Sequence, residues 1–308
     1  MAKVAFCFPG QGSQEVGMGR AMAEAFPSAR EVFDRARNAL GFDLRQICFD
    51  GPLERLSLTE MTQPALTATS LACLAAVREA GVEPDYVVGH SVGEYAALVA
   101  SGAISDEDAL RLVQERGLAM AEAALEAPGA MAAVLGLADE EVERLCESIE
   151  GVWPANYNCP GQLVVSGTEE GVARLMEAAQ AAGARRAVRL NVSGGFHSPL
   201  TASARRRLQP ALDAVRFHEP VTPFLSTVTC RLESAKEMAP ILLDQLTAPV
   251  KFTQAVERLA SRGAKTFVEV GSGNVLTGLV KRINKGVQAV SVSTPEGVEK
   301  LRGILARG

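Results

Sequence analysis

VVGHSVGEYAA, residues 87–97, places a serine between two glycines where an apolar strand-like run gives way to a helical pattern. Small apolar residues precede the serine turn, and helix-compatible residues such as Ala96 and Val99 follow it. A sharp turn from strand to helix strains its central residue, and flanking glycines remove the Cβ atoms that would clash there. The spacing is typical of a nucleophile elbow, which would present the Ser91 hydroxyl above the carboxyl end of a sheet.

The pattern alone leaves two interpretations of Ser91 open. In the first, the backbone N–H of Val92 and the dipole of the following helix face an oxyanion formed beside Ser91, so that the serine is a nucleophile. In the second, the serine only caps a helix between two packing glycines. The choice between them depends on the rest of the chain.

The composition is that of a globular protein with a substantial core, since 47% of the 308 residues are hydrophobic and 22% are charged. A net charge of −5 argues against a nucleic-acid-binding protein. The first residues, MAKVAFCFPGQG, lack the apolar region of a signal peptide, and no stretch reads as a membrane span. We therefore expect a cytoplasmic protein with no nucleic-acid or membrane partner.

The six cysteines are scattered and form no C-x-x-C pair. Together with only three histidines, they offer no zinc-ligand spacing. Reduced thiols are the expected state in a cytoplasmic protein. We expect neither a metal nor another cofactor.

The order of the predicted elements indicates an α/β fold in which a small unit interrupts a larger one. Residues 4–8 and the run before Ser91 read as strands, and 106–125 reads as a helix. The predicted elements of the small unit follow the order β-α-β-β-α-β, the ferredoxin-like arrangement, at residues 130–136, 139–148, 152–157, 163–166, 169–182 and 185–192. Strands at 223–228 and 265–270 come next, and the motif GSGNVL precedes a last helix. We predict a hydrolase-like large domain with a mostly parallel sheet (1–125 and 196–308) and a ferredoxin-like small domain (126–195).

A nucleophilic serine needs a general base, and His197 is the best candidate. His90 adjoins Ser91, but consecutive residues at an elbow point in different directions, and His218 reads as a surface or strand-end residue. His197 lies in NVSGGFHSPL, where two glycines before it and a proline after it constrain its loop. The alternative is a loop histidine that hydrogen-bonds only to the backbone.

No acid of a Ser-Asp-His triad is evident. The acidic residues between Ser91 and His197 fall at predicted helix starts, where capping explains them, and no HGGG-type oxyanion loop is present. A Ser–His dyad fits better than a triad. We expect a backbone carbonyl to orient the histidine in place of a carboxylate.

Eight motifs occur in an order that resembles one family along essentially the whole chain. They are FPGQGSQ (8–14), LTEMTQPAL (58–66), GHSVGEYAAL (89–98), ERGLAM (115–120), NCPGQLVVSG (158–167), GGFHSPL (194–200), PVKFTQAV (249–256) and EVGSGNVLTGLVKR (269–282). The chain resembles the malonyl-CoA:acyl carrier protein transacylases of fatty acid and polyketide synthesis. Together these motifs are far more specific than any one of them.

The resemblance implies a ping-pong acyl transfer whose substrates are malonyl-CoA and an acyl carrier protein. Ser91 would take the malonyl group as an ester and pass it to the phosphopantetheine thiol, with His197 as base and then acid. The second histidine nitrogen would be held by a carbonyl near Lys251. The N–H groups of Val92 and Gln11 would form the oxyanion hole. The Gln11 loop can also be interpreted as a phosphate site, but GQGSQE lacks the third glycine and the P-loop lysine.

The family match also implies a substrate-binding set. Arg116 corresponds to the arginine that pairs with the malonyl carboxylate, although helical geometry places it roughly 75° from the middle of its apolar stripe, where arginines are usually surface residues. Phe196 resembles the bulky ring of malonyl-selective members, and Gln63 and Asn158 match polar residues that line the site. Lys251 departs from the family's usual Gln or Arg.

Two other functions remain open from the sequence. One is a hydrolase that passes its acyl group to water, although a simple esterase needs no carboxylate clamp such as Arg116. The other is a silent docking module, which has no reason to retain Ser91, His197 and Arg116 together. The arginines at 185, 186, 189, 205, 206 and 207 would either steer an acidic carrier protein or be ordinary solvated residues.

Overall fold

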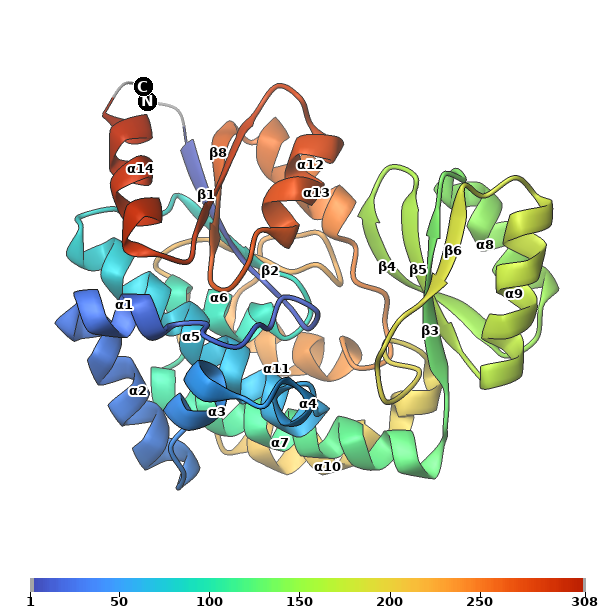
Figure 1. Ribbon diagram of the computed structural model, residues 1–308, viewed down its shortest axis with the longest axis horizontal. Coiled ribbons are helices and arrows are strands. Elements are labelled where there is room, and N and C mark those ends of the chain that lie inside the picture. Colours follow the sequence, from blue (N-terminus) through green and yellow to red (C-terminus); the bar gives the residue numbers. More distant parts are fainter. Residues whose placement is uncertain (1–2, 307–308) are drawn as a thin grey trace.

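A parallel sheet surrounded by helices lies beside a smaller antiparallel sheet in the computed structural model, which describes residues 3–306 (Figure 1). The parallel sheet has the strand order β7-β2-β1-β8-β9. Its strands are β1 (Lys3–Phe8), β2 (Tyr86–Gly89), β7 (Phe224–Leu225), β8 (Ala264–Val270) and β9 (Gln288–Val292). All neighbours in this sheet pair in parallel, and its central strands are nearly continuous apolar runs, as expected where helices cover both faces.

The second sheet has the order β4-β5-β3-β6, and every pair in it is antiparallel. Its strands are β3 (Ala130–Leu135), β4 (Val152–Cys159), β5 (Gln162–Gly167) and β6 (Arg186–Arg189). Side chains alternate across it: Ala132 and Val134 pack against α8 and α9, whereas Met131 and Ala133 join the main core. The antiparallel sheet therefore packs against the main core through the face that carries Met131 and Ala133.

Helices fill the space around the two sheets (Figure 1). Their bounds are α1 (Arg20–Ala25), α2 (Pro27–Leu40), α3 (Arg45–Asp50), α4 (Leu53–Leu56), α5 (Thr59–Glu79), α6 (Gly93–Ser101), α7 (Asp106–Glu126), α8 (Asp139–Ser148), α9 (Glu169–Ala181), α10 (Ala202–Asp213), α11 (Ala235–Asp244), α12 (Phe252–Ser261), α13 (Val275–Ile283) and α14 (Pro295–Leu305), with a 3₁₀ turn at Pro199–Thr201. Local chemistry sets several of their starts. The Ser105 hydroxyl accepts from the N–H of Asp108 at the start of α7, and the Thr168 hydroxyl accepts from that of Gly171 at the start of α9.

The predicted α/β class, with a mostly parallel sheet and a second small sheet, is confirmed. The β-α-β-β-α-β order from β3 to β6 also agrees with the sequence. Two details were wrong: α13 is not the last helix, because β9 and α14 follow it, and the strand predicted at 223–228 is only Phe224–Leu225. The domain limits at 125/126 and 195/196 stay a prediction.

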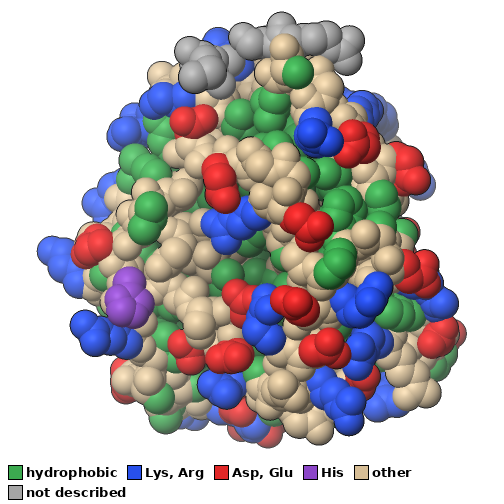
Figure 2. All heavy atoms as spheres, turned by 90° about the vertical axis from the view of Figure 1, so that its left-hand side faces the viewer, with side chains coloured by type: hydrophobic (Ala, Val, Ile, Leu, Met, Phe, Trp, Pro, Cys, Tyr) green, Lys and Arg blue, Asp and Glu red, His purple; other side chains and the backbone are tan. Residues whose placement is uncertain are grey.

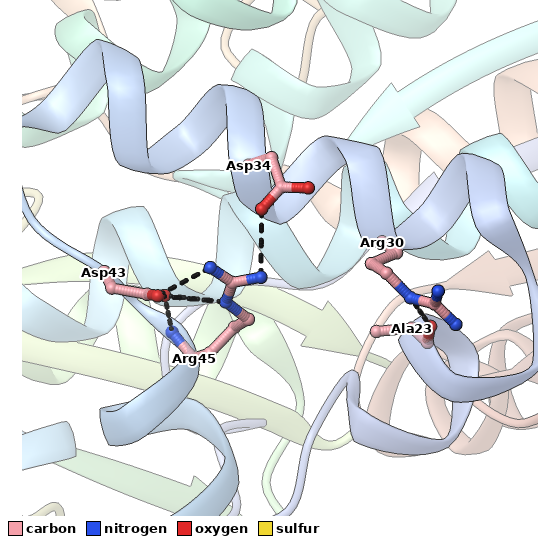
Figure 3. A network of polar contacts seen from close by, with 5 residues as sticks. All are labelled: Ala23, Arg30, Asp34, Asp43 and Arg45. Carbon is pink, nitrogen blue, oxygen red and sulfur yellow. Dashed lines mark hydrogen bonds and ion pairs between the residues drawn. The ribbon is translucent and has the colours of Figure 1, made fainter.

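A polar network joins the first three helices, as Figure 3 shows. Arg45 donates from Nε and Nη2 to the Asp43 carboxylate at 2.9 and 2.7 Å, and from Nη1 to Asp34 of α2 at 2.9 Å. Hydrogen bonds from Arg45 hold the pKa of Asp43 below its ordinary value. Arg30 of α2 donates to the carbonyl of Ala23 in α1 at 3.1 Å. These groups are largely solvated, so the network contributes modestly to stability and mainly fixes how α1, α2 and α3 meet.

The surface of this part of the molecule carries charges of both signs. Figure 2 shows the face that lies on the left of Figure 1, where Lys and Arg side chains are interspersed with Asp and Glu. Among the residues described in this view, no continuous basic patch of the kind that binds a nucleic-acid backbone is seen. Within residues 3–306, no helix combines the length and the apolar character needed to cross a membrane.

All six cysteines are free thiols, and five of them are buried, the exception being Cys230. Burial raises the pKa of the Cys48, Cys73 and Cys146 thiols to about 12. It also raises the pKa of Cys7, Cys159 and Cys230. The protein therefore holds its thiols in the protonated form.

Candidate active site

The turn between β2 and α6 has the geometry of a nucleophile elbow. Ser91 has a φ of 52°, in the left-handed region that a non-glycine residue rarely adopts. A Cβ on Gly89 would lie 2.1 Å from the Glu94 nitrogen, and a Cβ on Gly93 would lie 2.1 Å from the Phe8 carbonyl oxygen. Only glycine fits at both positions, so the two glycines allow β2 to turn directly into α6 and leave Ser91 at the tip.

His197 faces this serine from the loop after β6. Its Nε2 lies 2.8 Å from Ser91 Oγ, and both side chains are buried. Its Nδ1 lies 2.9 Å from the Gln245 carbonyl oxygen and 3.2 Å from that of Ala248. Because both carbonyls only accept, Nδ1 carries the proton and Nε2 is free to accept the Ser91 proton. His197 also has a positive φ of 59°, so the loop constraint predicted from GGFHSP is present.

Burial makes His197 a neutral imidazole. It lowers the pKa of His197 to about 3, and the nearby positive charge of Arg116 acts in the same direction. The imidazolium form is thus disfavoured, and the base form predominates at neutral pH.

Arg116 is buried beside the nucleophile and is only 1% exposed, contrary to the usual surface position of a residue at the flank of an apolar stripe. Its Nη1 donates to Gln63 Oε1 at 2.7 Å, and its Nη2 donates to Gln245 Oε1 at 2.9 Å and to Ser91 Oγ at 3.1 Å. Each of these acceptors is neutral. Among residues 3–306 the guanidinium has no carboxylate in an ion pair, and Nε has no partner. A buried cation without an anion is costly, so the site is prepared for an anionic ligand.

These groups border a cavity of about 330 Å³ between the parallel sheet and the second sheet. Gln11, His90, Ser91, Arg116 and His197 supply polar groups, and the apolar lining comes from Met120, Met131, Leu190, Val192 and Phe196. The size and the mixture of an apolar wall with a few convergent polar groups are typical of a small-molecule site.

The two predicted oxyanion donors both border this cavity. Gln11 lies in the loop after β1, and Val92 lies at the start of α6, one residue after the nucleophile. Within residues 3–306 neither backbone N–H has a hydrogen-bond acceptor. Residues with unpaired N–H groups that line the same cavity as a serine hydroxyl are what an oxyanion hole requires, and the oxyanion role of Gln11 and Val92 stays a prediction.

The structure brings most of the other predicted residues to the site. Phe196 borders the cavity, and Gln63 lies behind it, where its oxygen accepts from Arg116. Asn158 is linked to the site through His90, because its Oδ1 lies 2.9 Å from His90 Nε2. It borders a smaller neighbouring cavity with Pro9 and Leu276.

The carbonyl groups that hold His197 lie near Lys251 in the chain, as expected, but neither belongs to Lys251 itself. The carbonyl groups that hold His197 Nδ1 belong to Gln245 and Ala248, which lie earlier in the chain, after α11. Lys251 precedes α12, where its N–H donates to the Thr227 carbonyl and its own carbonyl accepts from Cys230 Sγ. No side-chain motif marks Gln245 and Ala248 for this role, because every residue carries a backbone carbonyl group.

The sequence also gave no indication of two other participants. Gln245 contacts Arg116 through its side chain and His197 through its backbone. Asn156 of β4 borders both cavities. Neither lies in a pattern that indicates chemistry, because one follows an ordinary helix and the other lies within a strand.

Comparisons with known proteins agree with this geometry. Residues 5–299 match the model of the acyl transferase domain family. The chain belongs to the acyl transferase family. The acyl transferase is 44% identical over 304 residues to a malonyl CoA-acyl carrier protein transacylase of Bacillus subtilis, covering 97% of this chain and 96% of that protein. It is 42% identical over 303 residues to the protein of the same name from Escherichia coli, covering 97% of this chain and 98% of that protein.

Solved structures give the same result. An acyl-carrier-protein-S-malonyltransferase of Bartonella henselae superposes on the acyl transferase with a TM-score of 0.95 at 40% identity, over 99% of each chain. A malonyl-transacylase solved in complex with its type II polyketide acyl-carrier protein gives a TM-score of 0.94 at 39% identity, over 97% of this chain and 98% of that one. The fold and the relation between the two sheets are therefore those of the family.

Acidification tests the neutral state of His197. Because its pKa is lower in the folded protein than the ordinary 6.5, His197 contributes stability that is complete above that pH and is lost as the pH falls toward 3. When the pH is lowered from 7 to 5, the unfolding free energy of the wild type should fall by roughly 2 kcal/mol more than that of His197→Asn. Urea unfolding at both pH values measures this difference. His218→Asn, at an exposed position, is the control, and equal losses in all three proteins would contradict a buried neutral His197.

Proposed function

We propose that this acyl transferase moves a malonyl group from coenzyme A to the phosphopantetheine thiol of an acyl carrier protein. The observation that carries the proposal is the contact set of Ser91, which has His197 Nε2 at 2.8 Å and the Arg116 guanidinium at 3.1 Å in a buried cavity. This set offers a nucleophile, its base and a cation for the free carboxylate of the acyl group. The names of the B. subtilis and E. coli relatives support the same donor and acceptor.

In the first half-reaction, Ser91 Oγ attacks the thioester carbonyl carbon while His197 Nε2 takes the hydroxyl proton. The carbonyl oxygen becomes an oxyanion, which the N–H groups of Gln11 and Val92 stabilise. The C–S bond then breaks, the Ser91 ester remains, and the imidazolium of His197 returns its proton to the thiolate of coenzyme A. The Gln245 carbonyl keeps the ring in the required tautomer throughout.

The second half-reaction reverses these roles with a different thiol. His197 takes the proton of the phosphopantetheine thiol, whose sulfur attacks the Ser91 ester. When the tetrahedral intermediate collapses, the C–O bond breaks and His197 returns the proton to Ser91 Oγ. Every proton transfer uses this chain's own groups, so we propose that the reaction needs no cofactor beyond its thioester substrate.

We propose a cytoplasmic location for this reaction. Six unpaired thiols support it, because such thiols persist in reducing compartments.

Incubation with malonyl-CoA, with and without a phosphopantetheinylated carrier protein, tests the function. We expect a malonyl adduct on Ser91 in the absence of carrier and malonyl-carrier protein in its presence, both read by mass spectrometry. Carrier proteins of a fatty acid and of a type II polyketide system are tested in parallel. Release of free malonate at the same rate with and without carrier would support the hydrolase alternative instead.

Carrier-protein docking gives a further prediction. Of the six arginines near His197 in sequence, Arg189 pairs with Glu169, Arg205 with Asp244, and Arg207 with Glu115 and Glu122, so their charges are partly neutralised. Arg185, Arg186 and Arg206 are exposed and form no ion pair among residues 3–306, and of these Arg185 and Arg186 lie together, before and at the start of β6. Charge reversal of both should raise the KM for an acidic carrier protein about 5- to 20-fold at low salt, and less at high salt.

The same double variant should form the malonyl-enzyme at the wild-type rate, because the acylation half-reaction does not involve the carrier. Arg37→Glu is the matched control, since Arg37 is exposed on α2, away from β6 (Figure 1). A KM for carrier protein that is unchanged by reversal of Arg185 and Arg186 would contradict the docking role.

A further inference from the structure

Glu94 is a buried carboxylate that the reaction described above does not use. It lies in the first turn of α6, three residues after Ser91, and is 0% exposed. Its Oε1 accepts from the N–H of Thr227 at 2.6 Å, from Thr227 Oγ1 at 2.8 Å and from Ser226 Oγ at 3.2 Å. Three donors from the segment after β7 therefore fix the carboxylate in one orientation.

The other carboxylate oxygen of Glu94 determines the orientation of the Gln245 amide. Gln245 Nε2 donates to Glu94 Oε2 at 2.5 Å and to the Ser91 carbonyl at 3.1 Å, while its Oε1 accepts from Arg116 Nη2. The two ends of an amide have nearly the same shape, so only the hydrogen-bond partners select which end points where. Two acceptors on one side require the NH₂ group there, which leaves the oxygen facing Arg116.

We propose that Glu94 is a positioning residue for acyl-group selection: it orients the Gln245 amide so that its oxygen holds Arg116 toward the carboxylate of the malonyl group. This inference rests on the proposed function. It assigns to Glu94 an effect on the binding of charged acyl groups that acts through two other side chains, without contact with the substrate.

The cost of burying Glu94 supports a functional role. Desolvation raises the pKa of Glu94 to about 7, although all of its hydrogen-bond donors act in the opposite direction. A buried charge of this kind is a poor source of stability. The protein offers a direct contrast in Glu269, whose buried carboxylate accepts from the N–H groups of Leu276 and Thr277 at the start of α13 and so has an evident capping role.

Glu94→Gln tests the proposal, because it preserves the shape and changes one acceptor into a donor. If the new amide oxygen keeps the three donors at the Oε1 position, its NH₂ group meets Gln245 Nε2. The Gln245 amide must then turn over, and its NH₂ group faces Arg116 in place of its oxygen. We expect kcat/KM for malonyl-CoA to fall about 10- to 100-fold, mainly through KM, while acetyl-CoA changes less than about 3-fold.

Two further variants complete the experiment. Glu269→Gln is the matched control and should lower Tm without altering the malonyl-to-acetyl ratio. Thr227→Val removes one donor to Glu94 and should lower that ratio about 3-fold, so it decides the matter if Glu94→Gln does not fold.

An unchanged ratio in folded Glu94→Gln, or in Thr227→Val when Glu94→Gln does not fold, would overturn the proposal, as would an equal fall for both substrates. The wild type is assayed in parallel, so that a failure of this inference can be told from a failure of the proposed function. A wild-type protein that loads no malonyl group would remove the proposed function, and this inference with it.

Discussion

Replacement of Ser91 by alanine is expected to abolish the malonyl-enzyme and to lower transfer to the carrier protein about 10⁴- to 10⁶-fold. The reason is that His197 Nε2 and the Arg116 guanidinium both converge on Ser91 Oγ, so that the base acts on this hydroxyl. The measurement is the mass of the protein after incubation with malonyl-CoA, together with the rate of carrier acylation.

Ser101→Ala is the matched control for this experiment. Ser101 is buried at the other end of α6, where its Oγ donates to the Leu98 carbonyl. Its loss should leave adduct formation intact. A full-yield malonyl adduct on Ser91→Ala would show that the nucleophile is another residue.

The second large effect concerns the charged end of the substrate. A carboxylate that enters the cavity loses its water shell, which is costly unless a cation replaces it. Arg116 can form a charge-assisted pair worth about 2–4 kcal/mol, so Arg116→Ala should lower kcat/KM for malonyl-CoA roughly 30- to 1000-fold. Transfer of an acetyl group should fall little or rise, because acetyl carries no carboxylate.

Arg116→Lys should recover only part of the malonyl activity, since an ammonium group cannot make two parallel bonds to a carboxylate. Arg111→Ala is the control, because Arg111 is exposed on the same helix, α7. The measurement is kcat/KM for malonyl-CoA and acetyl-CoA in each variant. Equal losses for both substrates in Arg116→Ala would mean that Arg116 supports only the fold.

The elbow and the alternating elements were predictable because they depend on local chemistry. G-x-S-x-G has a steric cause, which the close approaches at Gly89 and Gly93 make explicit. The order of elements from β3 to β6 follows from side-chain periodicity and capping residues such as Thr168. Arg116 shows the limit of such reasoning: its helical position indicates the flank of a stripe, and only the family resemblance pointed to its burial beside Ser91.

The remaining parts of the site depend on tertiary contacts that leave no local pattern. The carbonyl that orients His197 belongs to Gln245, a residue 48 positions away, and nothing in its side chain marks that role. The family resemblance placed this carbonyl only near Lys251, and Ala248, three residues before Lys251, supplies the second of the two carbonyls. The strand β9 was missed for a related reason, since Gln288–Val292 is short and lies at one end of the strand order, where it pairs with β8.

The buried thiols have a practical consequence for assays of the proposed reaction, in which a thioester releases a free sulfhydryl group. Disulfide exchange and alkylation both proceed through the thiolate, and burial keeps five of the six cysteines protonated and shielded. Coenzyme A released in the first half-reaction, without carrier protein, can therefore be followed with a chromogenic disulfide reagent while the native enzyme is present. The complete transfer gives no net colour, because one carrier thiol is consumed for each coenzyme A thiol released. The enzyme background is limited to Cys230, which is only partly accessible, and unfolding by denaturant would reveal the other sulfhydryl groups as a stepwise increase in colour.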